Sequence, residues 1–242
     1  MSDFRDQFYR DYVGFKLWDS DEGRKSPEIF ELEFKNLLSG GSAKVLEIGF
    51  GTGEFLDWAK ARGHSVCGIE LIPELVDQAR ARGHEAYKIN IQELQQSELA
   101  SKKFDLIVLF DVLEHLYVDE IVQCLKACKQ LLAPRGQVFI RVPNGLSPFG
   151  LAQFNKDITH VTLLTPERLN QVGRLCGLRV TASYNAARVV KSSGKPRWLK
   201  RALYALRDIY EIFMGALYYS GRFPLDPNLV VILKESDVEI SK

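Results

Sequence analysis

The feature that most constrains this chain is a set of alternating glycines, Gly49, Gly51 and Gly53, between an apolar segment and a predicted helix. Residues 44–48 have the pattern of a short buried strand, and the helix is predicted from Glu54 onward. Glycine suits positions where the backbone takes positive φ or where a ligand lies against the main chain. A loop that enters a helix also presents N–H groups to ligand oxygens. The segment therefore predicts a nucleotide-binding loop.

The loop differs from the dinucleotide fingerprint Gly-x-Gly-x-x-Gly. Position 54, where the third glycine would stand, is Glu54, and another carboxylate, Glu47, lies at the end of the strand. A carboxylate at that place repels a pyrophosphate and favours a ligand with positive charge. The stretch from Glu47 to Gly53, with Phe50 inside it, matches Glu/Asp-x-Gly-x-Gly-x-Gly at every fixed position. It resembles the first motif of the class I S-adenosylmethionine-dependent methyltransferases.

The resemblance implies S-adenosylmethionine as the cofactor, because this molecule carries an ammonium and a sulfonium and has no phosphate. It also implies an enzyme that transfers a methyl group. Two alternatives of different class stay open at this point. One is an NAD-dependent oxidoreductase, and the other is a non-catalytic module that binds S-adenosylmethionine.

Further positions suit an adenosine. Glu70 ends the second predicted strand 19 residues after Gly51, the offset at which a carboxylate reaches ribose hydroxyls in such folds. NAD binders share this charge, so Glu70 does not choose between the two ligands. Leu71 beside it is placed to lie on the adenine. Asn90 and Ile91, after the third strand, correspond to the adenine-edge contact of the resembled family; the alternative for Asn90 is a solvent-exposed turn.

A second motif ends the fourth predicted strand. Residues 104–110 form a near-continuous apolar run, typical of a central strand covered on both faces. The sequence Asp-Val-Leu-Glu-His that follows, residues 111–115, resembles the fourth motif of one subgroup of the same superfamily. Phe110 and Asp111 then fall at the same sheet edge as the glycine loop, and we assign them to cofactor binding.

The resemblance covers residues 44–184 and 228–234 and implies an α/β fold with a doubly wound, mostly parallel sheet of seven strands and an antiparallel last strand. The predicted strands are 44–48, 65–70, 85–90, 104–110, 137–142, 178–184 and 228–234. The predicted helices are 26–38, 54–62, 73–82, 118–132 and 165–176. We predict a turn at 134–136 and a long functional loop over 143–164.

Transfer of a methyl group from a sulfonium needs no metal, but a hydroxyl acceptor benefits from a general base. His160 lies in the long loop after the fifth strand, and Asp157 is placed three residues earlier, where it can orient the imidazole. His115 in the fourth motif is the second candidate. For each there is a structural alternative: His115 as a residue that holds the loop, and Asp157 with His160 as a hydrogen-bonded pair that pins it.

Composition narrows the partners and the compartment. The net charge of +1 over 242 residues does not favour nucleic acid, and no Asn-Pro-Pro-Tyr-type amine site follows the fourth strand. The four cysteines lie in apolar contexts without a Cys-x-x-Cys pair, which favours reduced, buried thiols and no metal site. No apolar run approaches the ~18 residues that span a bilayer. We expect a cytoplasmic protein, either soluble or peripheral at the inner face of the membrane.

The segment before the last strand is an insertion. Residues 199, 203, 206, 210, 213 and 217 are apolar at helical spacing, after a basic start and among several aromatic residues. This composition suits a membrane interface or a lipidic acceptor, and equally a lid or a homodimer helix. The expected organisation is an N-terminal helical cap (1–43), a methyltransferase domain (44–184 and 228–236) and a helical insertion (185–227). The acceptor is expected to be a small molecule, a saccharide or a lipid-linked molecule, methylated on oxygen.

Overall fold

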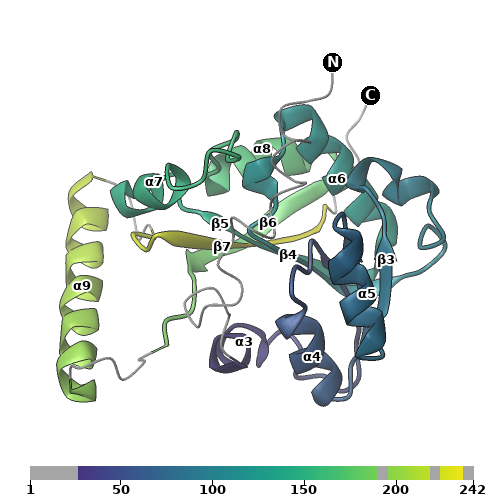
Figure 1. Ribbon diagram of the computed structural model, residues 1–242. Helices are drawn as coiled ribbons and strands as arrows, with labels where there is room; N and C mark the ends of the chain where they lie inside the picture. The colour runs from purple at the N-terminus through teal and green to yellow at the C-terminus, as the bar shows by residue number, and fades with distance from the viewer. Residues whose placement is uncertain (1–26, 190–195, 219–223, 237–242) are drawn as a thin grey trace.

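A seven-stranded sheet forms the centre of the molecule, with the order β3-β2-β1-β4-β5-β7-β6 (Figure 1). The computed structural model describes residues 27–189, 196–218 and 224–236, so the first 26 residues of the predicted cap lie outside it. Neighbouring strands are parallel except for β7, which is antiparallel to β5 and β6. The strands are β1 (Lys44–Ile48), β2 (Ser65–Glu70), β3 (Glu85–Lys88), β4 (Phe104–Phe110), β5 (Leu132–Pro143), β6 (Leu178–Asn185) and β7 (Asn228–Glu235). The predicted fold class and the antiparallel last strand are confirmed.

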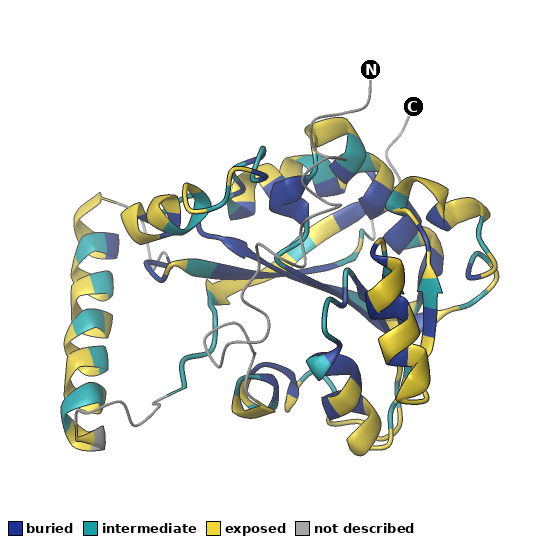
Figure 2. Ribbon diagram, in the orientation of Figure 1, coloured by how far each residue is buried: buried dark blue, intermediate teal, exposed yellow. Residues whose placement is uncertain are grey.

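Helices cover both faces of this sheet (Figure 1). They are α3 (Pro27–Phe34), α4 (Glu54–Ala61), α5 (Pro73–Ala81), α6 (Val118–Leu131), α7 (Pro148–Phe154), α8 (Pro166–Leu175) and α9 (Arg197–Tyr218), with 3₁₀ turns at Ile91–Gln96 and Leu113–His115. On the α6 and α8 side the core is mainly aliphatic. On the α3 and α4 side it is aromatic, and the rings of Phe34 and Phe139 lie 4.6 Å apart. Because β4 is covered on both sides, it is buried at six of its seven residues, as its apolar sequence predicts (Figure 2).

Three predicted elements differ from the structure by more than two residues. The first predicted helix ends at Phe34, four residues early, and continues as turns. Residues 134–136, predicted as a turn, belong to β5 but pair with no residue of β4, because the register jumps from Leu132 to Gln137. The loop 143–164 contains α7, whose start is fixed by Ser147: its side chain accepts a hydrogen bond from the Phe149 amide at 3.2 Å.

Helix α9 stands apart from the layered body, beyond the carboxyl ends of β5 and β6 (Figure 1). Several polar contacts join it to the body. Arg207 pairs with Asp226 at 2.6 Å, and the Glu211 carboxylate accepts hydrogen bonds from the Asn185 side chain at 2.7 Å and the Leu225 amide at 3.2 Å. Among the described residues no helix combines the length and apolarity needed to cross a membrane.

The four cysteines are buried and free, as predicted. Burial raises the pKa of the Cys67 thiol to about 12. The Cys124 side chain, by hydrogen bonding, and burial raise the pKa of the Cys128 thiol. A thiol in this state is a poor nucleophile, so these side chains belong to the core.

Candidate functional site

The glycine loop lies where the strand order reverses. From β1 the chain proceeds outward to β2 and β3, and then returns to β4 on the other side of β1. In open parallel sheets, ligands bind at the carboxyl ends of the strands beside such a reversal. Gly49, Gly51 and Gly53 have φ values of 69°, 57° and 79°, the left-handed region that glycine tolerates best. A Cβ at Gly49 would approach Val112 Cγ2 to 2.8 Å, so space as well as φ selects this glycine.

Glu70 is fixed against the loop by backbone amides. One oxygen accepts from Gly51 N at 3.0 Å, and the other accepts from Leu71 N at 2.6 Å and Ile72 N at 3.3 Å. The carboxylate at the end of β2 is therefore connected directly to the central glycine. Leu71 is 40% exposed beside it, which gives the loop an apolar surface next to an acidic group.

These residues fit an adenosylmethionine group. Glu47 is buried near the end of β1. With Glu70 it places two carboxylates beside a loop whose three glycines take positive φ. Carboxylates favour hydroxyls and cationic groups and oppose a pyrophosphate. The nearby cation, Arg82, is already engaged, because it donates to the Thr52 carbonyl at 2.6 Å and pairs with Asp57 at 3.4 Å. The donor set thus suits the charge of S-adenosylmethionine.

The side chains of three other residues that the sequence assigns to cofactor binding make contacts elsewhere in the protein. The ring of Phe50 packs in the small core between β2 and α5, and the ring of Phe110 packs in the aromatic core. The Asn90 side chain accepts from Gln92 N at 3.2 Å and so caps the 3₁₀ turn, with Ile91 half-buried behind it. A cofactor contact at Phe50 or Phe110 would therefore use the backbone, and one at Asn90 the backbone or the side-chain amide nitrogen.

Asp111 forms an ion pair that sequence reasoning missed. Its carboxylate accepts two hydrogen bonds from Arg141 at the end of β5, one of them at 3.0 Å. Burial would lower the pKa of Arg141, but Asp111 outweighs it and the pKa is raised. Asp111 also takes a φ of 56°. The strand register Phe110↔Arg141 brings the two together, and this neighbour is not visible in either motif alone.

The loop after α7 packs against the fourth motif. Val161 N and Thr162 N donate to the Glu114 carbonyl at 2.8 and 3.1 Å. Thr159, which the sequence does not single out, connects two predicted site residues: its hydroxyl donates to Asp157 at 2.6 Å and lies 2.9 Å from Nδ1 of His115. Because the hydroxyl proton goes to Asp157, Nδ1 of His115 is the donor to Thr159.

Burial alone would raise the pKa of Asp157, but the hydrogen bonds from the side chain and amide of Thr159 outweigh it, and the pKa is lowered. The stability that a carboxylate contributes in this way is present above the ordinary carboxyl pKa. It is lost only as the pH falls through the lowered value. Asp157 therefore stays ionised at neutral pH.

His160 lies beside His115, with ring centroids 4.6 Å apart. Its Nδ1 is 2.8 Å from the Phe154 carbonyl at the end of α7, and since a carbonyl only accepts, Nδ1 carries the proton. Nε2 is then the basic nitrogen of the neutral ring. Asp157 is 3.9 Å from Nε2, an ion-pair distance once the ring is charged. The sequence placed Asp157 on the other nitrogen; the structure gives that orienting contact to Phe154.

Glu114, His115 and His160 bring three ligand-type atoms within 4.8 Å of one another. Glu114 and His115 are buried, and the His160 side chain is 8% exposed. A buried carboxylate beside imidazoles stabilises a proton on either ring. The same geometry would also admit a divalent cation, since imidazole and carboxylate are both metal ligands.

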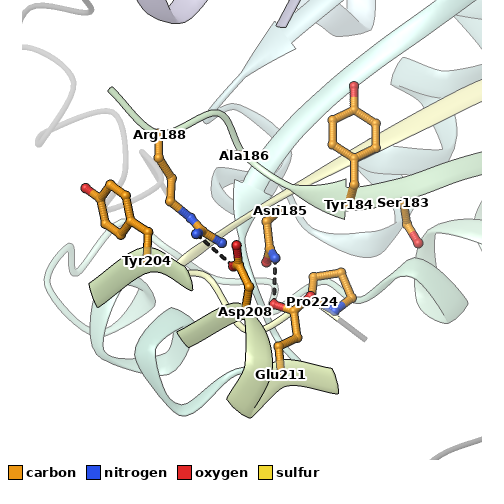
Figure 3. A pocket seen from close by; sticks show the side chains of 9 residues that line it. All are labelled: Ser183, Tyr184, Asn185, Ala186, Arg188, Tyr204, Asp208, Glu211 and Pro224. Atoms are coloured by element: carbon orange, nitrogen blue, oxygen red, sulfur yellow. Dashed lines mark hydrogen bonds and ion pairs between the residues drawn. The ribbon is translucent and has the colours of Figure 1, made fainter. Parts of the chain in front are cut away.

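A cavity of about 620 Å³ lies between β6 and α9 (Figure 3). Arg188 on its wall pairs with Asp208 at 3.0 Å and with Asp226, and its guanidinium lies 5.4 Å from the Tyr204 ring. Because β6 and β1 are separated by four strand steps of ~4.8 Å, this cavity is about 19 Å from the glycine loop along the sheet. It lies at the same carboxyl edge but does not serve as the cofactor pocket.

Comparison with solved structures agrees with this fold. A SAM-dependent methyltransferase from Archaeoglobus fulgidus is similar with a TM-score of 0.64 and 20% identity, over 91% of this chain and 100% of that one. The 1,6-didemethyltoxoflavin-N1-methyltransferase of Burkholderia thailandensis, solved with S-adenosylhomocysteine, has a TM-score of 0.59 and 19% identity, over 96% and 87%. At these identities the likeness shows the fold.

Sequence comparison identifies the family. The model of the methyltransferase domain family matches residues 17–183, and the chain belongs to this family. The ubiquinone biosynthesis O-methyltransferase of Xanthomonas axonopodis pv. citri is 26% identical over 217 residues, covering 86% of this chain and 81% of that protein. The enzyme of the same name from Xylella fastidiosa (strain M23) is 34% identical over 141 residues, covering 55% and 54%. The protein is an enzyme that uses S-adenosylmethionine, which confirms the predicted activity and cofactor.

Proposed function

We propose that the enzyme methylates a hydroxyl oxygen of a small-molecule, saccharide or lipid-linked acceptor, with His160 as the general base. The observation that carries the proposal is the contact of His160 Nδ1 with the Phe154 carbonyl, which sets Nε2 as the proton acceptor. The O-methyltransferase names of the relatives support oxygen as the methylated atom and a small molecule as the acceptor.

When bound, S-adenosylmethionine supplies a methyl group on a positively charged sulfur, which is already activated for displacement. The chain then has two tasks: to align the acceptor oxygen with that methyl group and to remove the hydroxyl proton. Nε2 of His160 would take the proton of the acceptor hydroxyl as the oxygen receives the methyl group. The resulting imidazolium has Glu114 and Asp157 near it, at 4.8 Å or less and at 3.9 Å. Solvent later takes the proton.

His115 has a positioning role in this scheme. Its Nδ1–H is held by Thr159, which is itself held by Asp157, so the two histidines keep a fixed relative orientation. Glu70 would hold the ribose hydroxyls and Glu47 the ammonium group, with Leu71 on the adenine and the backbone of Ile91 at its edge. Gly49, Gly51 and Gly53 let the cofactor lie against the main chain. The ion pair of Asp111 with Arg141 would support the strand ends against which the cofactor lies.

The remainder of the acceptor needs a place of its own. The cavity between β6 and α9 lies at the reacting edge but beyond the cofactor, so it suits a part of the acceptor that is remote from the methylated atom. This assigns the insertion 185–227 to acceptor handling, beside the methyltransferase domain 44–184 and 228–236 and the N-terminal cap. A lipid-linked acceptor would be met at a membrane surface, and α9 is the element available for that contact or for a homodimer.

A screen with labelled S-adenosylmethionine tests the proposed acceptor. Phenols, saccharides and lipid-linked hydroxyl compounds are compared with matched amines, and we expect label to enter a hydroxyl compound only. The assay is run with and without a chelator, because the geometry at Glu114, His115 and His160 would also suit a metal ion. Transfer to amines alone would refute oxygen as the methylated atom. Loss of activity with the chelator would indicate that a metal ion, and not His160 as a general base, activates the acceptor.

Replacement of Glu70 by alanine should weaken S-adenosylhomocysteine binding by about 1–3 kcal/mol, the cost of leaving ribose hydroxyls without a charged acceptor. The change also removes the acceptor of the Gly51 amide. Calorimetric titration measures the affinity, and the melting temperature reports the fold. Glu74→Ala, an exposed acidic residue at the start of α5, is the matched control. Equal affinities in the two variants would show that Glu70 only braces the loop.

A further inference from the structure

The half-buried side of helix α9 carries charged residues that face the body of the protein. Along one side of the helix, residues 200, 204, 207, 211 and 215 are half-buried or buried, and Arg207 and Glu211 bind each other at 2.9 Å. A surface helix of a globular protein normally buries its apolar side. Here the ion pairs and hydrogen bonds to Asp226, Asn185 and Leu225 fix the polar side against the body.

The opposite side of α9 is apolar and exposed along its length (Figure 2). The exposed apolar residues of α9 are Trp198, Leu203, Leu206, Ile209, Tyr210, Ile212, Phe213, Leu217 and Tyr218, with exposures from 44% to 69%. We call this set the outer face of α9. An apolar surface of this extent marks an interaction site, because exposure of so many large side chains is otherwise unfavourable.

The charges that border the outer face indicate what covers it. Both acidic residues of α9 are paired with arginines, the 57% exposed Asp208 with Arg188 and the largely buried Glu211 with Arg207. Near the start of α9, Lys200 is half-buried on the inner side, whereas Arg201 is exposed one turn after Trp198. The rim of the outer face is therefore cationic and complements an anionic surface.

A second copy of the chain suits this face less well than a lipid surface. Two outer faces in contact would bring no unpaired carboxylate of α9 to the cationic rim, since Asp208 and Glu211 are both paired with arginines. An anionic bilayer offers an apolar interior for the leucines and phenylalanine, an interfacial zone for Trp198 and Tyr210, and phosphates for Arg201. The helix would lie in the plane of the interface.

We propose that the outer face of α9 docks the enzyme on an anionic lipid surface. Docking places the inner side of α9, and with it the cavity toward β6, directly above the bilayer at the reacting edge of the sheet (Figure 3). An acceptor anchored in the lipid would then reach the enzyme from that side. Only this last step rests on the proposed function; the docking surface stands on α9 itself.

The full-length protein is sedimented with vesicles of phosphatidylcholine alone and of phosphatidylcholine mixed equally with phosphatidylglycerol. We expect it to pellet with the anionic vesicles. Reversal of the exposed cation, Arg201→Glu, should weaken binding at least about fivefold, because a single charge contributes on the order of 1 kcal/mol near an anionic surface. Leu206→Ser with Phe213→Ser should weaken it similarly.

The control pair is Leu32→Ser with Leu175→Ser, which removes equally exposed apolar side chains on α3 and α8. It should pellet as the wild type does. Absence of the wild type from both pellets would overturn the proposal, and so would a dimer in sedimentation velocity that Leu206→Ser with Phe213→Ser dissociates. S-adenosylhomocysteine affinity, measured on every variant, should stay unchanged. Failure of the acceptor screen with vesicle binding intact would reject the proposed function and leave the docking surface standing.

Discussion

A Gly51→Val variant should give no measurable S-adenosylhomocysteine binding in a calorimetric titration. Gly51 has a φ of 57° and its amide holds the Glu70 carboxylate, so it lies at the centre of the loop that the cofactor must approach. A branched side chain there fills the space of the ligand and opposes the positive φ. The loss should be at least about a hundredfold, or ~3 kcal/mol, since both effects act on the same few atoms.

The matched control separates binding from backbone strain. Gly63, in the turn between α4 and β2, has a φ of 82°, and a Cβ there would meet nothing within 4 Å. Gly63→Val thus carries the same kind of strain at a place far from the strand reversal. Both variants should lose similar melting temperature, but only Gly51→Val should lose the ligand. Normal affinity in Gly51→Val would refute the glycine loop as the cofactor site.

The sequence predicts the sheet well because its signals are local. Strands β1, β2 and β4 have the predicted bounds, since Gly49 follows β1, the charged Glu70 ends β2 and Asp111 follows β4. The prediction of a turn at 134–136 is wrong because the pairing of its flanking residues with the neighbouring strand β4 determines the local structure. Phe104 and Leu106 shift register there, which lets a proline segment remain in β5. Helix α7 was detectable from Ser147-Pro148, a cap followed by proline.

The sequence predicts the motifs of the candidate site but not the hydrogen bonds and ion pairs that join their residues. Glu47, Glu70 and the glycines lie at the carboxyl edge because strand ends meet there, whatever the packing of the side chains. The link from Asp157 through Thr159 to His115 depends on how the loop after α7 lies on the fourth motif, which spacing alone does not determine. The same is true of Arg141, whose pairing with Asp111 follows from the strand register.

The His160→Ala variant should lose about 10²–10⁴ in turnover while its affinity for S-adenosylhomocysteine changes within a few fold. The assay uses the hydroxyl acceptor found by the screen, at saturating cofactor. The physical reason is the position of the proton: the Phe154 carbonyl holds Nδ1–H, so Nε2 alone can accept the hydroxyl proton. Asp157→Asn should lose less, because Asp157 stabilises the charged ring from 3.9 Å without touching the acceptor.

His160→Asn separates a base from a residue that only holds the loop. The amide of asparagine can still donate to the Phe154 carbonyl, but it cannot take up a proton at neutral pH. If His160 only pins the loop, His160→Asn should restore turnover while His160→Ala stays low; if it is the base, both stay low. His84→Ala, a buried histidine paired with Asp57 at 2.6 Å on the far side of the sheet, controls for loss of an imidazole. Normal turnover in His160→Ala with loss in His115→Ala would move the base to the fourth motif, where a ring nitrogen of His115 lies within 4.8 Å of ligand-type atoms of Glu114 and His160.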